Sequence, residues 1–159
     1  MMNKKKLVDV HQYMPVLREI LGTGKEVSLT ITGNSMSPFL VHERGEILIS
    51  PPDGNWKKGD MAFYQRTNGQ YVMHRIIGEK EGRYICLGDN TITLEYISPE
   101  QMIGMVSAFK RGEKRIEVCN RYYKLYCFIW VLVSPVRIFL FKGKNKLFRW
   151  IKRFIKDKK

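Results

Sequence analysis

An Asn-Gly pair at residues 68 and 69 constrains the fold more than any other feature of this chain, because strand-like sequence flanks it on both sides. Both residue types tolerate the positive φ that the tightest hairpin turns require. We therefore expect residues 61–65 and 70–77 to pair as antiparallel strands. The fold should accordingly contain antiparallel sheet.

Other short segments favour strands in the same way. Residues 26–32 alternate strictly between polar and apolar side chains, which is typical of a half-buried strand. Shorter segments of strand-like sequence follow at residues 46–50, 84–87, 102–109 and 115–118. Together they predict a mainly β domain that occupies residues 1–120.

One helix is expected before these strands. Apolar residues recur at helical spacing between residues 7 and 21, and Gly22 and Gly24 favour a stop after them. Pro15 lies inside this run, and proline is best tolerated in the first turn of a helix. We therefore expect the helix to begin near Pro15.

The end of the chain, residues 121–159, has a different composition. Residues 125–136 are almost all apolar, but the run is shorter than the roughly 20 residues that cross a bilayer. Residues 137–159 contain ten basic residues and one acid, so they carry +9 of the total charge of +13. Apolar and basic side chains there follow helical spacing, as in a helix lying on an anionic membrane.

We therefore predict a membrane-associating tail. Its expected membrane-binding residues are Trp130, Phe148, Trp150 and Arg153. Whether the tail crosses the bilayer once or lies at its surface is open, as is the side on which the domain lies. The positive charge favours a cytoplasmic end, and no cleavable export signal is predicted.

The cysteines do not indicate a cross-linked or metal-bound protein. Cys86, Cys119 and Cys127 are odd in number and form no Cys-x-x-Cys pair. Neither a disulfide framework nor a zinc site is indicated. We expect no metal and no cofactor.

Two residues could form a nucleophile and its base. Ser35 follows Gly33 at the end of the first expected strand, where a sharp turn could present both its hydroxyl and its amide. His74 lies within an expected strand and shares a face with apolar residues, so its imidazole needs a polar partner. Each residue has a simpler interpretation, a turn serine and a core histidine. His11 and His42 are interpreted as solvated.

These residues belong to a set of short motifs in a characteristic order. The set resembles the type I signal peptidase and LexA-like serine peptidase superfamily over about residues 26–109, and each motif alone is weak. The motifs are Gly33-x-Ser35-Met36-x-Pro38, Lys58-Gly59-Asp60, His74-Arg75-Ile76-Ile77-Gly78 and Leu87-Gly88-Asp89-Asn90.

The resemblance implies a signal peptidase or LexA-like β-fold and a reaction. Ser35 would be the nucleophile and His74 the general base, as in the branch that carries histidine where most relatives carry lysine. Asp89 is the first choice for the acid that assists His74, and Glu95 the second. An extended peptide substrate would contact the loop residues Gly33, Asn34, Met36 and Pro38.

Two other functions stay open. The chain could cleave itself, as LexA-like proteins do, although only 34 residues precede Ser35. It could instead be a non-catalytic basic module that binds membranes or nucleic acid. The apolar run at residues 125–136 favours anionic lipid over nucleic acid, which offers nothing for that run to bury against.

Overall fold

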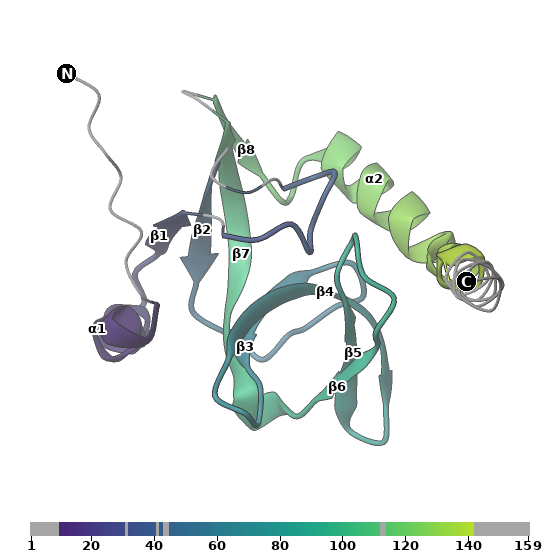
Figure 1. The fold of residues 1–159 in the computed structure, drawn as a ribbon. Helices are drawn as coiled ribbons and strands as arrows, with labels where there is room; N and C mark the ends of the chain where they lie inside the picture. The colour runs from purple at the N-terminus through teal and green to yellow at the C-terminus, as the bar shows by residue number, and fades with distance from the viewer. Residues whose placement is uncertain (1–9, 31, 41, 43–44, 112–113, 142–159) are drawn as a thin grey trace, which may run out of the picture.

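The protein is mainly β, as the sequence predicts (Figure 1). A computed structural model describes residues 10–30, 32–40, 42, 45–111 and 114–141. Within these residues, eight strands form one antiparallel sheet, and helices lie before and after it. The strands are β1 (Val27–Thr30), β2 (Glu46–Ser50), β3 (Met61–Gln65), β4 (Tyr71–Lys80), β5 (Arg83–Leu87), β6 (Glu95–Ile97), β7 (Met102–Arg111) and β8 (Lys114–Glu117).

Strand β7 connects the two halves of the sheet. The strand order is β1-β2-β7-β3-β4-β5-β6, and β8 pairs with β7 outside this path. The first residues of β7 pair with β3, whereas its later residues pair with β2 and β8. Segments that are distant in sequence, such as the end of β1 and the start of β4, are thereby held in one framework.

The predicted hairpin is confirmed. Strands β3 and β4 pair antiparallel with Tyr64 opposite Val72 and Ala62 opposite His74. Gly69 has a φ of 86°, and its amide donates a hydrogen bond to the carbonyl of Arg66 at 2.9 Å. The Asn-Gly pair therefore sets the register that places His74 in the sheet.

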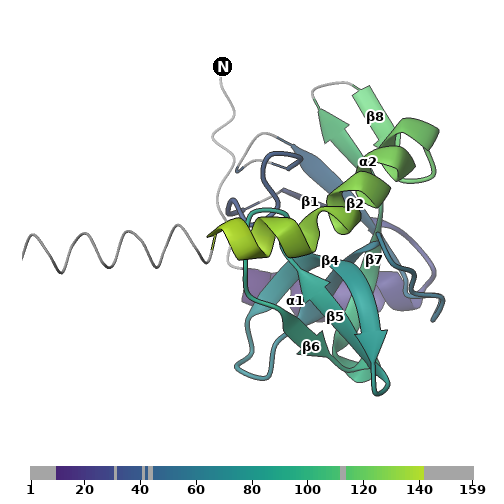
Figure 2. The ribbon, with the colours of Figure 1, turned by 90° about the vertical axis from the view of Figure 1, so that its right-hand side faces the viewer.

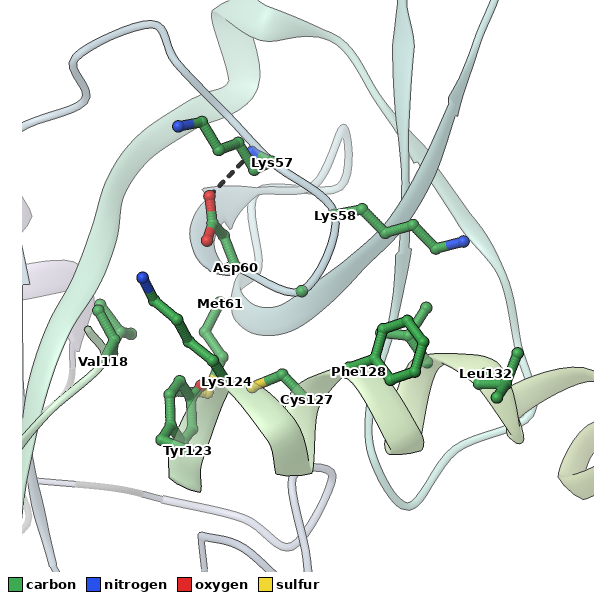
Figure 3. A pocket seen from close by; sticks show the side chains of 13 residues that line it. Lys57, Lys58, Asp60, Met61, Val118, Tyr123, Lys124, Cys127, Phe128 and Leu132 are labelled. Atoms are coloured by element: carbon green, nitrogen blue, oxygen red, sulfur yellow. Dashed lines mark hydrogen bonds between the residues drawn. The ribbon is translucent and has the colours of Figure 1, made fainter. Parts of the chain in front are cut away.

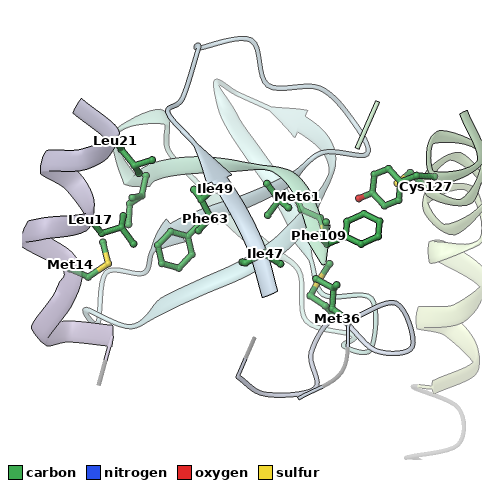
Figure 4. Close-up of a cluster of buried hydrophobic side chains, with 14 residues drawn as sticks. Met14, Leu17, Leu21, Met36, Ile47, Ile49, Met61, Phe63, Phe109 and Cys127 are labelled. Atoms are coloured by element: carbon green, nitrogen blue, oxygen red, sulfur yellow. The ribbon is translucent and has the colours of Figure 1, made fainter. Parts of the chain in front are cut away.

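The first helix, α1 (Val10–Gly22), begins earlier than the sequence indicates. The prediction that it starts near Pro15 is wrong, because Pro15 lies inside the helix. Burial against the sheet outweighs the lost backbone hydrogen bond: Met14, Leu17 and Leu21 are all buried in the main core. Figure 4 shows these three side chains pointing from α1 towards the strands.

The main core extends across the sheet to the second helix, α2 (Arg121–Leu132). Tyr123, Cys127 and Val131 recur every four residues along α2 and are buried. Figures 1 and 2 show α2 lying along the opposite side of the sheet from α1. A smaller apolar cluster lies on the other face of β3 and β4.

The apolar run of the tail is bent. Helix α2 ends at Leu132, and a second helical segment, Ser134–Phe141, continues at an angle of 49°. Pro135 has no amide hydrogen for the carbonyl of Val131, and the Ser134 hydroxyl donates to that carbonyl instead, at 2.7 Å. Among the described residues, no single helix is long and apolar enough to cross a membrane. The two helical segments of this bent pair, taken together, are long and apolar enough by length and composition alone.

Candidate active site

The loop that carries Ser35 begins directly after β1. Gly33 has a φ of 86°, and its amide donates a hydrogen bond to Nδ1 of His42 at 2.9 Å. The His42 amide in turn donates to Oδ1 of Asn34 at 3.3 Å. His42 is exposed, as predicted, and its two hydrogen bonds also hold the two ends of this loop together.

A second loop, Gly88-Asp89-Asn90, packs directly against the first. The amide of Asn90 donates to the carbonyl of Ser35 at 2.7 Å. A Cβ atom on Gly88 would lie only 2.8 Å from that same carbonyl oxygen, so no larger residue fits without displacement. The two motifs singled out in the sequence thus meet through their backbones.

Asp89 does not contact His74. Its carboxylate accepts two hydrogen bonds from Arg75, Nε to Oδ1 at 2.9 Å and Nη2 to Oδ2 at 2.7 Å, with both side chains buried. Burial of the guanidinium disfavours its charge, but the Asp89 carboxylate more than compensates and raises the pKa of Arg75. Asp89 therefore forms an ion pair with Arg75, while its charge also acts to raise the pKa of His74, and its assistance to His74 stays a prediction.

Glu95, the second choice, occupies the place beside His74. Its Oε1 lies 3.1 Å from Nδ1 of His74, and the hydroxyl of Tyr64 lies 3.0 Å from the same nitrogen. Arg66 binds the other side of the carboxylate through two hydrogen bonds, of 2.7 and 2.5 Å. His74 itself is only 3% exposed, so these groups define its surroundings.

The sheet explains why His74 and Arg75 take different carboxylates. Consecutive residues of a strand point to opposite faces. Arg75 points towards α2, where it also donates to the hydroxyl of Tyr123 at 3.1 Å. His74 points to the other face, which Glu95 reaches because it pairs with Cys86 of β5.

The charges in this cluster fix the protonation state of His74. Burial lowers the pKa of His74 below its usual 6.5, although the nearby Glu95 charge acts in the opposite direction. Partial burial would raise the pKa of Glu95, but the hydrogen bonds from Arg66, together with the charge that His74 carries when it is protonated at low pH, lower it overall. At neutral pH the imidazole is therefore neutral and the carboxylate ionised.

This electrostatic state also selects a tautomer. An ionised carboxylate can only accept, so Glu95 favours a proton on Nδ1, provided that the Tyr64 hydroxyl beside the same nitrogen donates to the carboxylate rather than to the ring. The lone pair of the ring then lies on Nε2, which forms no hydrogen bond with any described residue. His74 is thus arranged to accept a proton at Nε2.

Ser35 and His74 line the same open cleft, which has a volume of about 610 Å³. Glu95, Gly33 and Met36 line it too, together with Thr32, Arg66, Asn68, Tyr71, Val72, Met73, Thr91 and Thr93. Within the described part of the chain, no hydrogen bond joins the Ser35 hydroxyl to His74. Ser35 and His74 therefore share a cleft without a hydrogen bond between them.

The cleft borders the edge of a strand. Tyr71, Val72, Met73 and His74 are consecutive and their side chains alternate in direction, yet all four line it. Pairing of β4 with β5 begins only at Arg75, so among the described strands Val72, Met73 and His74 pair on one side alone, with β3. An extended chain could therefore add to this edge.

The remaining predicted site residues divide into three groups. Gly33 and Met36 line the cleft, and Met36 is also part of the main core. Asn34 and Pro38 are exposed but are not part of the cleft lining. Phe148, Trp150 and Arg153 lie outside the described residues.

Trp130 is turned towards the protein. Its ring stacks on Tyr126 with centroids 5.5 Å apart, and the guanidinium of Arg137 lies 5.0 Å from its centroid. Arg137 also donates hydrogen bonds to the carbonyls of Gly88 and Asp89. Through these contacts Trp130 and Arg137 help to hold the tail on the loop that carries Asp89, and binding of lipid by Trp130 stays a prediction.

The sequence did not single out Tyr64, Arg66 or the role of Arg75. The hairpin register contained a signal for Tyr64, because it pairs with Val72, two residues from His74 on the same face. No group of three or more His, Cys, Asp or Glu side chains able to hold a metal ion occurs among the described residues. No protein-family model, curated protein or solved structure matches this chain.

Proposed function

We propose that this chain is a membrane-associated serine endopeptidase that cuts a signal, leader or precursor peptide. Ser35 acts as nucleophile and His74 as general base, as the resemblance to the histidine branch of the signal peptidase and LexA-like superfamily implies. The observation that carries the proposal is the buried imidazole of His74, anchored at Nδ1 by Glu95 and with Nε2 unbonded, in one cleft with Ser35.

The groups have the chemistry that peptide-bond cleavage requires. The Ser35 hydroxyl gives its proton to Nε2 of His74 as its oxygen attacks the carbonyl carbon of the substrate. Glu95 stabilises the imidazolium that forms, and the imidazolium then protonates the leaving amine. Water, activated in turn by His74, hydrolyses the ester on Ser35 and releases the second product.

The backbone around Ser35 supports the same step. A developing oxyanion needs N–H donors held in place before the reaction. The Ser35 amide donates to no described residue, and the Ser35 carbonyl is fixed by the amide of Asn90. The Ser35 amide is therefore the proposed oxyanion donor.

The substrate is an extended peptide that adds to β4 at residues 72–74, on the side where no described strand pairs with them. Main-chain hydrogen bonds would supply the affinity, as in other cases of strand addition. Residues 72–74 provide this edge and end at His74, so a peptide bound there passes the base. Ser35 borders the same cleft, on the loop that follows β1.

Association with anionic lipid is supported by the outer face of α2 and of the helical segment after it. Phe128, Leu132, Phe139 and Leu140 are between 62% and 77% exposed, although they are large and apolar. Exposed apolar surface of this kind marks an interaction site. The positive charge of residues 137–159 favours a negatively charged membrane as the partner.

Peptide cleavage tests the proposal. The full chain, purified with anionic lipid, would be incubated with synthetic leader peptides that have an apolar segment followed by small residues, and the products read by mass spectrometry. Ser35→Ala and His74→Ala should each lower the cleavage rate by at least about 10³-fold. Ser37→Ala is the matched control, because Ser37 lies in the same loop but outside the cleft lining, and it should cleave at the wild-type rate.

The same samples separate cleavage of a peptide from cleavage of the chain itself. An intact mass that shortens with time for the wild type but not for Ser35→Ala would show self-cleavage. Equal cleavage of the peptides by wild type and Ser35→Ala would refute the assignment of the nucleophile.

A further inference from the structure

A second cavity, of about 390 Å³, lies away from the active-site cleft, between α2 and the loop before β3 (Figure 3). Volumes of this size accommodate small-molecule ligands. Most of its lining is apolar and comes from three sources. Met61 and Val106 belong to the sheet, Val118 precedes α2, and Phe128 and Val131 belong to α2 itself.

Lysines gather at the rim of this cavity. Lys57 and Lys58 come from the loop, Lys124 comes from α2, and all three are exposed while lining the cavity. The one acid of the lining, Asp60, accepts a hydrogen bond from the amide of Lys57 at 2.8 Å, and this bond shapes the turn. The rim therefore keeps an excess of positive charge beside an apolar interior.

The loop is held firmly in this position. The amide of Gly59 donates to the carbonyl of Ile76 at 2.8 Å, and the Ile76 amide donates to the carbonyl of Asp60 at the same distance. A Cβ atom on Gly59 would lie 3.6 Å from the Cβ of Cys127, so the loop passes close to α2. The lysines are thus presented on a fixed framework.

The cavity is continuous with the exposed apolar face of the tail. Phe128 and Leu132 line the cavity and are 66% and 65% exposed. Figure 3 shows both on the side of α2 that borders the cavity. A ligand with a negatively charged head and an apolar chain matches this arrangement, because its charge would meet the lysines while its chain enters the apolar interior.

We propose that this cavity binds one anionic phospholipid, with its phosphate beside Lys57 and Lys124, whose side chains extend to the same side in Figure 3, and part of an acyl chain between α2 and the sheet. The inference rests on the membrane association proposed above and is independent of the peptidase chemistry. It adds to that association a defined site for a single lipid on the catalytic domain.

The test uses full-length Ser35→Ala protein, so that its result does not depend on cleavage. Native mass spectrometry from detergent micelles with equal amounts of phosphatidylglycerol and phosphatidylcholine would measure the lipid that stays bound. We expect one phosphatidylglycerol per chain, retained over phosphatidylcholine. Absence of a lipid adduct, or equal retention of both lipids, would overturn the proposal.

Two triple variants with the same change in charge locate the site. Replacement of the three rim lysines by alanine should lower the fraction with bound phosphatidylglycerol by at least about fivefold, since each lysine near a phosphate contributes on the order of 1 kcal/mol. The control variant combines Lys25→Ala, Lys80→Ala and Lys114→Ala, at exposed positions outside the cavity. It should lower the fraction with bound phosphatidylglycerol less than about twofold, because these lysines are not near the bound phosphate. Equal losses would overturn the proposal.

A second pair of variants tests the acyl-chain part of the site. Val131→Phe fills the cavity and should remove the adduct, whereas Leu125→Phe, at a position of α2 that is 57% exposed and outside the lining, should keep it. The far-UV circular dichroism of both proteins would be compared with that of the parent. The lysine variants decide the outcome if Val131→Phe does not fold, because all their positions are exposed.

Discussion

Replacement of Asp89 by asparagine should destabilise the protein strongly, because it breaks a buried ion pair. Arg75 is 0% exposed and Asp89 is 2% exposed, and their two hydrogen bonds are 2.9 and 2.7 Å long. An asparagine is almost isosteric but neutral. It would leave the guanidinium charge without its partner in a site that water does not reach.

Removing one partner of a buried pair costs about 3–5 kcal/mol. Since 1 kcal/mol moves the midpoint of a domain of this size by about 2–4 °C, we expect a decrease in Tm of about 6–20 °C. Thermal unfolding followed by circular dichroism measures it. Asp53→Asn is the matched control, because Asp53 is exposed and its hydrogen bond from the amide of Asn55 can be kept, so its Tm should stay within about 2 °C.

Melting temperature and peptidase activity of Asp89→Asn together distinguish a structural from a catalytic role of Asp89. If Asp89→Asn melts with the wild type but loses peptidase activity, Asp89 acts in the reaction and the geometric assignment to Arg75 is wrong. If it melts early and its residual activity at low temperature is near that of the wild type, the ion pair is structural.

Two further changes test the cluster around His74, and a third tests the contact between the loops that carry Ser35 and Asp89. Glu95→Gln should lower kcat/KM by about 10²- to 10⁴-fold, as expected when a carboxylate that orients a histidine is lost. In the wild type kcat/KM should rise with pH and level off below neutral pH, because burial holds the pKa of His74 below 6.5. Glu95→Gln removes a charge that raises this pKa, so the rise in kcat/KM should move to lower pH. A move to higher pH would contradict the assignment of Glu95. Tyr64→Phe should lower kcat/KM less than Glu95→Gln does, since Glu95 would still orient the imidazole of His74. An equal loss of kcat/KM would show that the Tyr64 hydroxyl is the main group that orients His74. Gly88→Ala should lower both Tm and kcat/KM, because its Cβ would be 2.8 Å from the carbonyl of Ser35, and wild-type values for both would show that this contact is not required.

Local sequence was sufficient to predict most of the strands. The boundaries of β2 and β3 agree with those expected, because each is a short apolar segment bounded by turn residues. Strand β6 was missed, since Glu95–Ile97 is too short to show a period. Its position depends on pairing with β5, a contact that local sequence does not encode.

The choice between Asp89 and Glu95 could not be made from the sequence. Both follow β5, and both could approach His74 if only distance along the chain is considered. The decision depends on the face of the sheet that each one reaches. Glu95 pairs with Cys86, on the face of His74, whereas Asp89 lies on the face of Arg75 and α2. Only the tertiary arrangement contains that information.

The tail shows a similar limit. Residues 125–136 are apolar on all sides, so the sequence gives no periodic signal for the side that packs on the domain. The structure divides this run, with Cys127 and Val131 buried and Phe128 and Leu132 exposed. Arg137 adds a contact to the Gly88-Asp89 loop that its position in a basic segment did not indicate.

The activation of Ser35 by His74 can be measured most directly with a phosphonate probe that reacts with nucleophilic serines and needs no known substrate. Intact and peptide mass spectrometry of the full chain in anionic lipid would identify the labelled residue and follow its rate from pH 5 to pH 9. The proposed dyad predicts one adduct, on Ser35, formed faster as His74 loses its proton and at least about 10²-fold slower in His74→Ala. Labelling at another residue, or at an unchanged rate in His74→Ala, would contradict it.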